Sequence, residues 1–178
     1  MPRSSVALQF RAEAYDHPDG SVDAGTVMTW IDKTAYAAAA SWSGGDVVGS
    51  YVGNMHFANP VPVETRVIVE ARVVHTGRTS VHVQTRVVLP DTRDQHGKAV
   101  VCTECVMVYV AVDSAGVPVP VRPWEPSTPE ELERALFDVT VDIDVPRFEL
   151  ATPATGDPYT RLVLTGTIEA RLAGVGTT

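Results

Sequence analysis

One stretch near the N-terminus constrains the fold of this chain more than any other. Its first part has the composition of a turn, because Pro18 fixes its own φ and Gly20 permits a positive φ. The alanine-rich residues that follow have high helix propensity, and Asp23 is a good N-cap. We therefore expect a helix that begins near Ala24 and ends at residues 43–45, where two glycines follow a serine.

Apolar residues recur along this helix at spacings of three and four, which makes one broad apolar face. The residues of this face are Val27, Met28, Ile31, Ala35, Ala38, Ala39 and Trp42. Asp32 lies four residues after Met28 and three before Ala35, beside this face rather than opposite it. A carboxylate there is costly to desolvate, so it needs either a partner or a chemical purpose.

The composition is that of a globular protein and excludes several classes of partner. The 178 residues are 44% hydrophobic, which suits one domain with a core, with or without an appendage. A formal charge of −8 without long single-sign runs argues against nucleic acid and anionic membrane surfaces as partners. No apolar run is long enough to span a membrane, and the first five residues lack the apolar core of a signal peptide. We expect a cytoplasmic protein.

Cys102 and Cys105 form a C-x-x-C pattern, which can indicate a redox or metal site. They lie within residues 99–110, a β-rich run in which positions three apart point to opposite faces. No second cysteine pair completes a tetrahedral site, and the five histidines are scattered singly. We interpret both as ordinary strand cysteines and expect no metal.

Much of the remaining chain reads as strands, which are residues 5–12, 47–57, 66–74, 80–89 and 98–112. The third and fourth form an antiparallel hairpin, and in the fourth His82 falls on the polar face with Gln84 and Arg86. A polar loop is expected over residues 90–97. The last strand should be the longest, and because its second half is apolar on both faces, something must pack on each side there.

The C-terminal part contains one helix signal and two alternating runs. A short helix is expected over residues 128–137, and two more strands are plausible near residues 139–145 and 162–172. We expect one domain over residues 1–137 and a C-terminal extension over residues 138–178. That extension could pair with the main sheet, contact a partner chain, or be loosely attached.

One strand, one long helix and four antiparallel strands follow one another in the order of a hotdog fold. Four motifs, taken in chain order, strengthen this interpretation. The first is Gly20-x-Val22-x-x-Gly25 followed by Met28-x-x-Ile31-Asp32-x-x-Ala35, and the second is Phe57-x-x-Pro60. The third is Gly77-Arg78-Thr79-Ser80, and the fourth is Val110-Ala111-Val112-Asp113 followed by Gly116 and Pro118-Val119-Pro120. Together, in this order, they resemble the hotdog-fold acyl-CoA thioesterases of the cytosolic acyl-CoA hydrolase type. The resemblance covers roughly residues 5–136.

The resemblance implies an α+β hotdog fold, with an antiparallel sheet of about five strands wrapped around one long central helix. It implies hydrolysis of an acyl-CoA to free acid and coenzyme A, without a cofactor or metal. A single curled sheet also leaves an edge strand unpaired, so we expect a homodimer or a higher homo-oligomer.

The same resemblance assigns candidate roles. Asp32 would act as general base or nucleophile, and the helix N-terminal amides around Ala24 and Gly25 would polarise the thioester carbonyl. His17 would orient water or bind the carbonyl. The other candidates for substrate contact are Phe57, Arg78, Thr79 and Ser80, of which Arg78 and Ser80 would meet the nucleotide phosphates.

The chain departs from the family pattern at three positions. His17 stands where an asparagine is frequent, Ala24 replaces the first of two glycines, and Glu64 replaces a common glycine before the third strand. These differences leave open a non-catalytic acyl-binding module. A hydratase or dehydratase is a further alternative, although Asp16 with His17 does not reproduce the loop motif of that class.

Plain structural readings also stay open. Asp32 could be a helix aspartate paired with Lys33 or with a cation across an interface. His17 could be a surface loop histidine, and Arg78 an exposed turn arginine.

Overall fold

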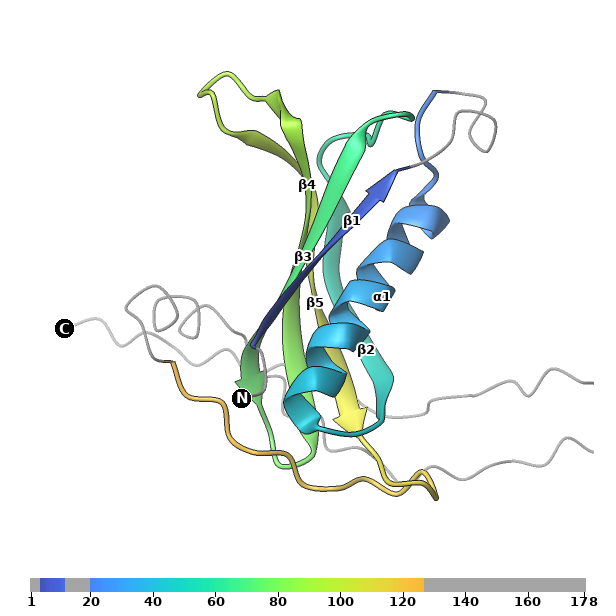
Figure 1. Cartoon of the computed structure of the whole chain (residues 1–178), viewed down its shortest axis with the longest axis vertical. Coiled ribbons are helices and arrows are strands. Elements are labelled where there is room, and N and C mark those ends of the chain that lie inside the picture. The colour runs from blue at the N-terminus through green and yellow to red at the C-terminus, as the bar shows by residue number, and fades with distance from the viewer. Residues whose placement is uncertain (1–3, 12–19, 127–178) are drawn as a thin grey trace, which may run out of the picture. The chain divides into compact units, whose positions relative to one another are not determined.

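The computed structural model describes residues 4–11 and 20–126, and residues 1–3, 12–19 and 127–178 lie outside that description. The elements are β1 (Ser5–Arg11), α1 (Ala24–Ser43), β2 (Val47–Phe57), β3 (Arg66–Thr76), β4 (Ser80–Arg93) and β5 (Ala99–Ala111). The strands form one sheet in the order β1-β3-β4-β5-β2, with every neighbouring pair antiparallel. The long helix α1 lies across one face of it (Figure 1). This confirms the expected α+β hotdog fold with five strands and one helix.

Several expectations fall outside the described residues. They are His17, the short helix over residues 128–137 and both strands of the C-terminal extension. The chain divides into two units, Met1–Ala135 and Leu136–Thr178, of which the second lies wholly outside the described part. The domain boundary near residue 137 therefore stays a prediction.

Local chemistry sets both ends of α1. The Asp23 side chain accepts a hydrogen bond from the Thr26 amide at 3.0 Å and another from the Thr26 hydroxyl at 2.6 Å. At the other end Gly44 has φ 76 and donates its N–H to the Ala40 carbonyl at 2.9 Å. The helix boundaries expected from the sequence are confirmed.

The core lies between α1 and the inner face of the sheet. The apolar face expected for the helix is buried except at Met28, which is half-buried. Trp30 and Thr34, which were not assigned to that face, are buried as well. Trp30 stacks on Phe10 of β1 with ring centroids 5.2 Å apart, and the Thr34 hydroxyl donates to the Trp30 carbonyl. The sheet contributes the expected alternate residues, which are Val67, Val69, Ala71, Val73, Val81, Val83 and Val87.

His82 is buried, which corrects its assignment to an exposed polar face. It lies opposite Val108 in the register of β4 and β5, and residues 107–111 of β5 are all buried. Both faces of the second half of β5 are therefore covered, as expected, and His82 of β4 lies on the same covered face as Val108. Burial first, and the neighbouring His75 second, lower the pKa of His82 to about 4.

The strand β4 runs further than the sequence indicated. It continues through Pro90 to Arg93 and has 14 residues, against 13 for β5, so β5 is not the longest strand. The strand tolerates Pro90 because its pairing with β5 is irregular between Leu89 and Arg93. No backbone N–H is needed there to hydrogen-bond the neighbouring strand. Arg66 of β3 adds a two-point ion pair to Asp91, with distances of 3.0 and 2.6 Å.

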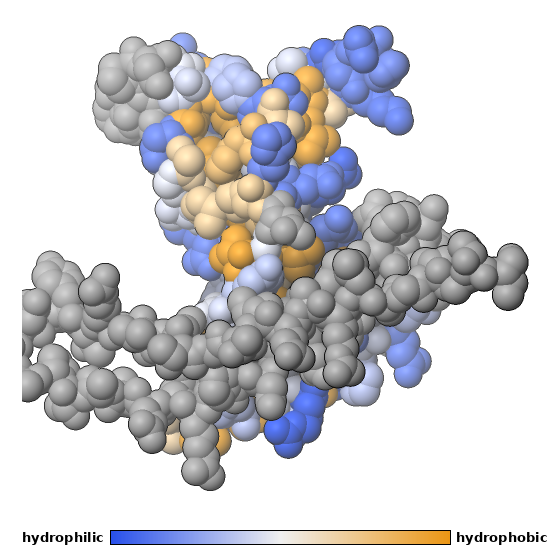
Figure 2. All heavy atoms as spheres, turned by 180° about the vertical axis from the view of Figure 1, so that it is seen from behind, coloured by the Kyte–Doolittle hydropathy of each residue, from blue (hydrophilic) through white to orange (hydrophobic). Residues whose placement is uncertain are grey.

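The edge strand β2 carries much of the exposed apolar surface. Val48, Val52 and Phe57 are exposed, as is Tyr36 on α1. Seen from behind (Figure 2), the described part of the molecule shows hydrophobic and hydrophilic areas side by side. None of the described helices combines the length and apolarity needed to cross a membrane.

Candidate active site

The start of α1 presents backbone donors at an open position. Ala24 and Gly25 are exposed, and amides in a first helical turn have no intrahelical acceptor. Asp23 takes up the amide of Thr26, the third residue of the helix. A Cβ at Gly25 would lie 3.0 Å from Asp23 Oδ1, so glycine keeps both the cap and the access open. The positive end of the helix dipole at this place can hold a carbonyl oxygen that gains negative charge.

Asp32 lies two turns further along the helix and is exposed in the single chain. Its Oδ1 accepts a hydrogen bond of 2.8 Å from the hydroxyl of Tyr109 on β5. Neither Lys33 nor any other cation in the described part of the chain forms a salt bridge with it. One carboxylate oxygen of Asp32 therefore bonds to a core residue, Tyr109, while the side chain as a whole is open to solvent.

Gly25 and Asp32 are separated along the helix by seven residues. At 1.5 Å per residue, the separation is about 10 Å. A donor to the carbonyl oxygen and a base acting on the same carbonyl must each lie about 3 Å from the reacting atoms. Asp32 therefore makes no direct contact with the first turn of its own helix, and an attacking water and a carbonyl group would have to fill the space between them.

The turn between β3 and β4 contains three substrate-binding candidates. It is closed by a hydrogen bond from the Gly77 amide to the Ser80 carbonyl. Ser80 is half-buried, and its Oγ lies 3.5 Å from His82 Nε2. The carbonyl oxygen of Thr79 accepts a hydrogen bond from the Ala111 amide. Arg78 is exposed and has no ion pair with a described residue. Arg78 is therefore the candidate most open to a ligand.

Phe57 and this turn lie at opposite ends of the sheet. Phe57 pairs with Thr103, whereas Thr79 is bonded to Ala111, eight residues further along β5. Eight residues of strand span about 26 Å. The start of α1 belongs to the Phe57 end, because the Val22 amide bonds to the carbonyl of Val61, just after β2. One chain alone does not bring Arg78 to Gly25.

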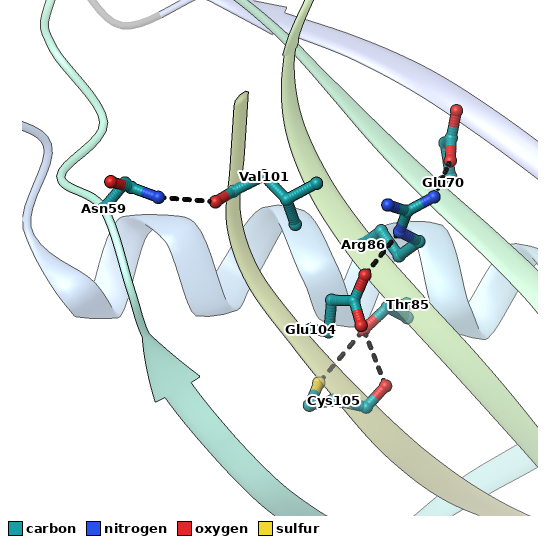
Figure 3. A network of polar contacts seen from close by, with 7 residues as sticks. All are labelled: Asn59, Glu70, Thr85, Arg86, Val101, Glu104 and Cys105. Atoms are coloured by element: carbon teal, nitrogen blue, oxygen red, sulfur yellow. Dashed lines mark hydrogen bonds and ion pairs between the residues drawn. The ribbon is translucent and has the colours of Figure 1, made fainter. Parts of the chain in front are cut away.

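A second polar cluster lies on the strands themselves (Figure 3). Arg86 of β4 bonds to Glu104 of β5 and lies 3.9 Å from Glu70 of β3. Asn59 donates to the Val101 carbonyl at 2.9 Å nearby. Because these charged groups pair with one another across neighbouring strands, the cluster is explained by its contribution to the stability of the sheet.

The two cysteines are free and buried, in different surroundings. Cys105 Sγ lies 3.0 Å from the Thr85 hydroxyl, and Cys102 Sγ lies 3.7 Å from the Pro60 carbonyl. Burial raises the pKa of both thiols, so they stay protonated and unreactive near neutral pH. They are ordinary strand cysteines, as the sequence indicated. Across residues 4–11 and 20–126, His, Cys, Asp and Glu nowhere gather in threes as a metal site requires.

Tyr109 is the site residue that sequence reasoning missed. A signal was available, because a tyrosine on the helix-facing side of an apolar strand must find a partner for its hydroxyl. Finding that partner required the placement of α1 over the sheet, since Asp32 and Tyr109 are 77 residues apart.

Comparison with known proteins gives consistent matches. The sequence profile of the thioesterase superfamily matches residues 19–95. The acyl-CoA thioester hydrolase YciA of Salmonella typhimurium is 31% identical over 121 residues, which is 67% of this chain and 91% of that protein.

Two solved structures show the same fold. A hexameric acyl-CoA thioesterase in its apo form has 30% identity and a TM-score of 0.67, covering 75% of this chain and 85% of its own. The hexameric thioesterase y2039 of Yersinia pestis has 31% identity and a TM-score of 0.58, covering 65% of this chain and 93% of its own.

Proposed function

The chain belongs to the thioesterase superfamily and, within it, to the acyl-CoA thioester hydrolases, and from this premise we propose that it hydrolyses acyl-CoA to free acid and coenzyme A. The observation that carries the proposal is the open carboxylate of Asp32, held by a buried tyrosine on the central helix of this fold. Both free cysteines agree with a protein of the reducing cytoplasm, which we include in the proposal.

In the proposed reaction Asp32 removes a proton from a water molecule, whose oxygen attacks the thioester carbonyl carbon. The negative charge on the carbonyl oxygen is stabilised by the amides at the start of a helix, with Gly25 as the central donor and Ala24 beside it. When the C–S bond breaks, the thiolate of coenzyme A leaves and takes up the proton. Direct attack by Asp32, followed by hydrolysis of the anhydride, uses the same groups. His17 is proposed to help orient the water.

We propose that each site draws on two chains. In one chain Gly25 and Asp32 lie about 10 Å apart along the helix, and Arg78 lies at the other end of the sheet. A second copy that pairs its edge strand β2 with this β2 can place its Asp32 near this Gly25. The exposed apolar residues Val48 and Val52 on β2 suit such a contact. The two similar solved structures are both hexameric, which supports a homodimer or a multiple of it.

The same pairing of two β2 strands also accounts for the turn that contains Arg78, which lies far from Gly25 within one chain. Val47 at the start of β2 pairs with Ala111, which is bonded to Thr79, so the turn lies at the Val47 end. Two antiparallel copies of β2 related by a two-fold axis put the Val47 end of one beside the Phe57 end of the other. The partner subunit's Arg78 then lies toward the end that holds Gly25, where it can meet the phosphates of coenzyme A.

The first test is direct. The purified protein is incubated with acyl-CoA substrates of increasing chain length and a thiol reagent that reports free coenzyme A. We expect thiol release with at least one substrate. No release from any of them would contradict the proposal and favour the non-catalytic module or the hydratase.

The two-chain site has its own test. Gly25→Pro removes the amide donor in the first helical turn, where no intrahelical hydrogen bond is lost, and Asp32→Asn removes the carboxylate. Both homo-oligomers should be inactive. Mixing the two after dissociation should restore activity, because each heterodimer has one site with Gly25 and Asp32 intact. No recovery in the mixture, or a fully active monomer in sedimentation equilibrium, would contradict a shared site.

A further inference from the structure

The ring of Tyr109 is fixed by contacts from the sheet and the helix. It is 1% exposed and lies between Val81 of β4 and Gly49 of β2 in the register of the sheet. A Cβ at Gly49 would come 3.6 Å from the ring, so the glycine lets the aromatic face lie close against the strand. Tyr36 of α1 meets the ring edge-on, with centroids 6.3 Å apart. The position of the Tyr109 hydroxyl is therefore well determined.

That hydroxyl has one proton to donate, and its nearest acceptor is the Asp32 carboxylate. Oδ1 of Asp32 lies 2.8 Å away, while the Asp32 carbonyl oxygen and Met107 Sδ lie at 3.3 and 3.7 Å. Burial, followed by the hydrogen bond to Asp32, raises the pKa of Tyr109 well above its ordinary value. The phenol stays protonated across the neutral range and can only act as a donor to the carboxylate.

The consequence concerns the orientation of an exposed side chain. An aspartate on an open helix surface samples several rotamers, each of which places its oxygens differently. Here one oxygen is held by a rigid donor, and the other, Oδ2, accepts no hydrogen bond from the described residues. A reacting group needs such positioning, because a displacement of about 1 Å can cost a hundredfold in rate.

We propose that Tyr109 is a positioning residue of the thioesterase reaction, which holds Asp32 Oδ1 so that Oδ2 is presented to the attacking water or the thioester. The proposal rests on the proposed function of Asp32. It assigns Tyr109 no contact with the substrate, since the residue is buried beneath the carboxylate that it holds.

The test is Tyr109→Phe, which removes the hydroxyl and keeps the ring. A hydrogen bond to a charged group contributes enough for kcat to fall about ten- to thirtyfold, while KM changes less than about twofold. Tyr36→Phe is the matched control, because that tyrosine packs on the same ring and its hydroxyl makes no hydrogen bond in the described structure. It should keep wild-type kcat.

A double-mutant cycle separates positioning from general damage to the fold. In the Asp32→Asn background, the further change Tyr109→Phe should lower the residual rate much less than it does in the wild type. An equal loss in both backgrounds would overturn the proposal, as would a wild-type kcat for Tyr109→Phe. If the wild type itself releases no thiol, the proposed function fails instead, so the two failures are distinguishable.

A second variant covers the case in which Tyr109→Phe does not fold. Asp32→Glu keeps the charge but moves the carboxylate by one methylene from the place that Tyr109 defines. We expect a fall in kcat of about tenfold or more with little change in KM. Wild-type kcat in Asp32→Glu would show that the carboxylate needs no fixed position and would overturn the proposal.

Discussion

The amide of Val22 donates a hydrogen bond of 2.8 Å to the carbonyl of Val61, which ties the segment before α1 to the loop before β3. The Val63 amide adds a second bond, to the Gly20 carbonyl at 3.2 Å. These two bonds fix the start of α1 against the sheet and so fix the direction of its open amides. The loop that provides them contains one strained residue, Glu64, with φ 58. This is the position at which the family commonly has glycine.

Glu64→Gly should stabilise the protein. A side chain in the left-handed region costs about 1–2 kcal/mol, of which the extra entropy of glycine in the unfolded chain offsets part. We expect the free energy of unfolding to rise by about 0.5–1 kcal/mol in denaturant titration. Glu64→Ala is the control, since it removes the carboxylate but keeps the Cβ. Equal stabilisation by both variants would show that the backbone strain is not the cause.

Arg78→Ala should weaken binding of the nucleotide part of the substrate. An exposed ion pair with a phosphate is worth about 1 kcal/mol, so KM for acyl-CoA should rise about fivefold. KM for an acyl thioester of a short thiol without the nucleotide should be unchanged. Equal effects of Arg78→Ala on both substrates would contradict the assignment.

His82 should make stability depend on pH below neutrality. Its pKa is lowered from about 6.5 to about 4 in the folded state, so the unfolded chain binds the extra proton first as the pH falls. The free energy of unfolding should therefore decrease between pH 6.5 and pH 4, by an amount on the order of 3 kcal/mol from this group. Above about pH 7.5 His82 is neutral in both states and the effect vanishes.

Thermal unfolding from pH 7 to pH 4.5 measures this. His82→Asn should show a shallower decline than the wild type, while His96→Asn, which changes an exposed turn histidine, should decline as the wild type does. Identical slopes for His82→Asn and the wild type would remove His82 as the cause.

Local chemistry explains which parts of the fold could be predicted. The ends of α1 follow from Asp23 and Gly44, which act within four residues of the positions that they cap. The burial of His82 depends instead on the register of β4 with β5, and the continuation of β4 past Pro90 goes with a register shift and with an ion pair between Arg66 and Asp91, 25 residues apart. Alternation within one strand does not carry such information.

The candidate site divides in the same way. Spacing along one helix was enough to single out Asp32, and the turn motif was enough for Arg78. The hydroxyl that holds Asp32 and the distance from Arg78 to Gly25 both depend on how strands far apart in the sequence pair. The unpaired edge strand already indicated a second chain from the sequence, and the positions of Arg78 and Gly25 at opposite ends of the sheet add a geometric reason for it.

The role proposed for Asp32 is tested most directly by comparing the steady-state hydrolysis of acyl-CoA by Asp32→Asn with that by the wild type. The amide keeps an acceptor for the Tyr109 hydroxyl, so the variant should melt close to the wild type. It loses the base, and kcat should fall by about a hundredfold or more, whereas Asp46→Asn, an exposed aspartate just after the helix, should be unaffected. Thiol release by a folded Asp32→Asn protein at a rate within a few-fold of the wild type would contradict the central role of this carboxylate.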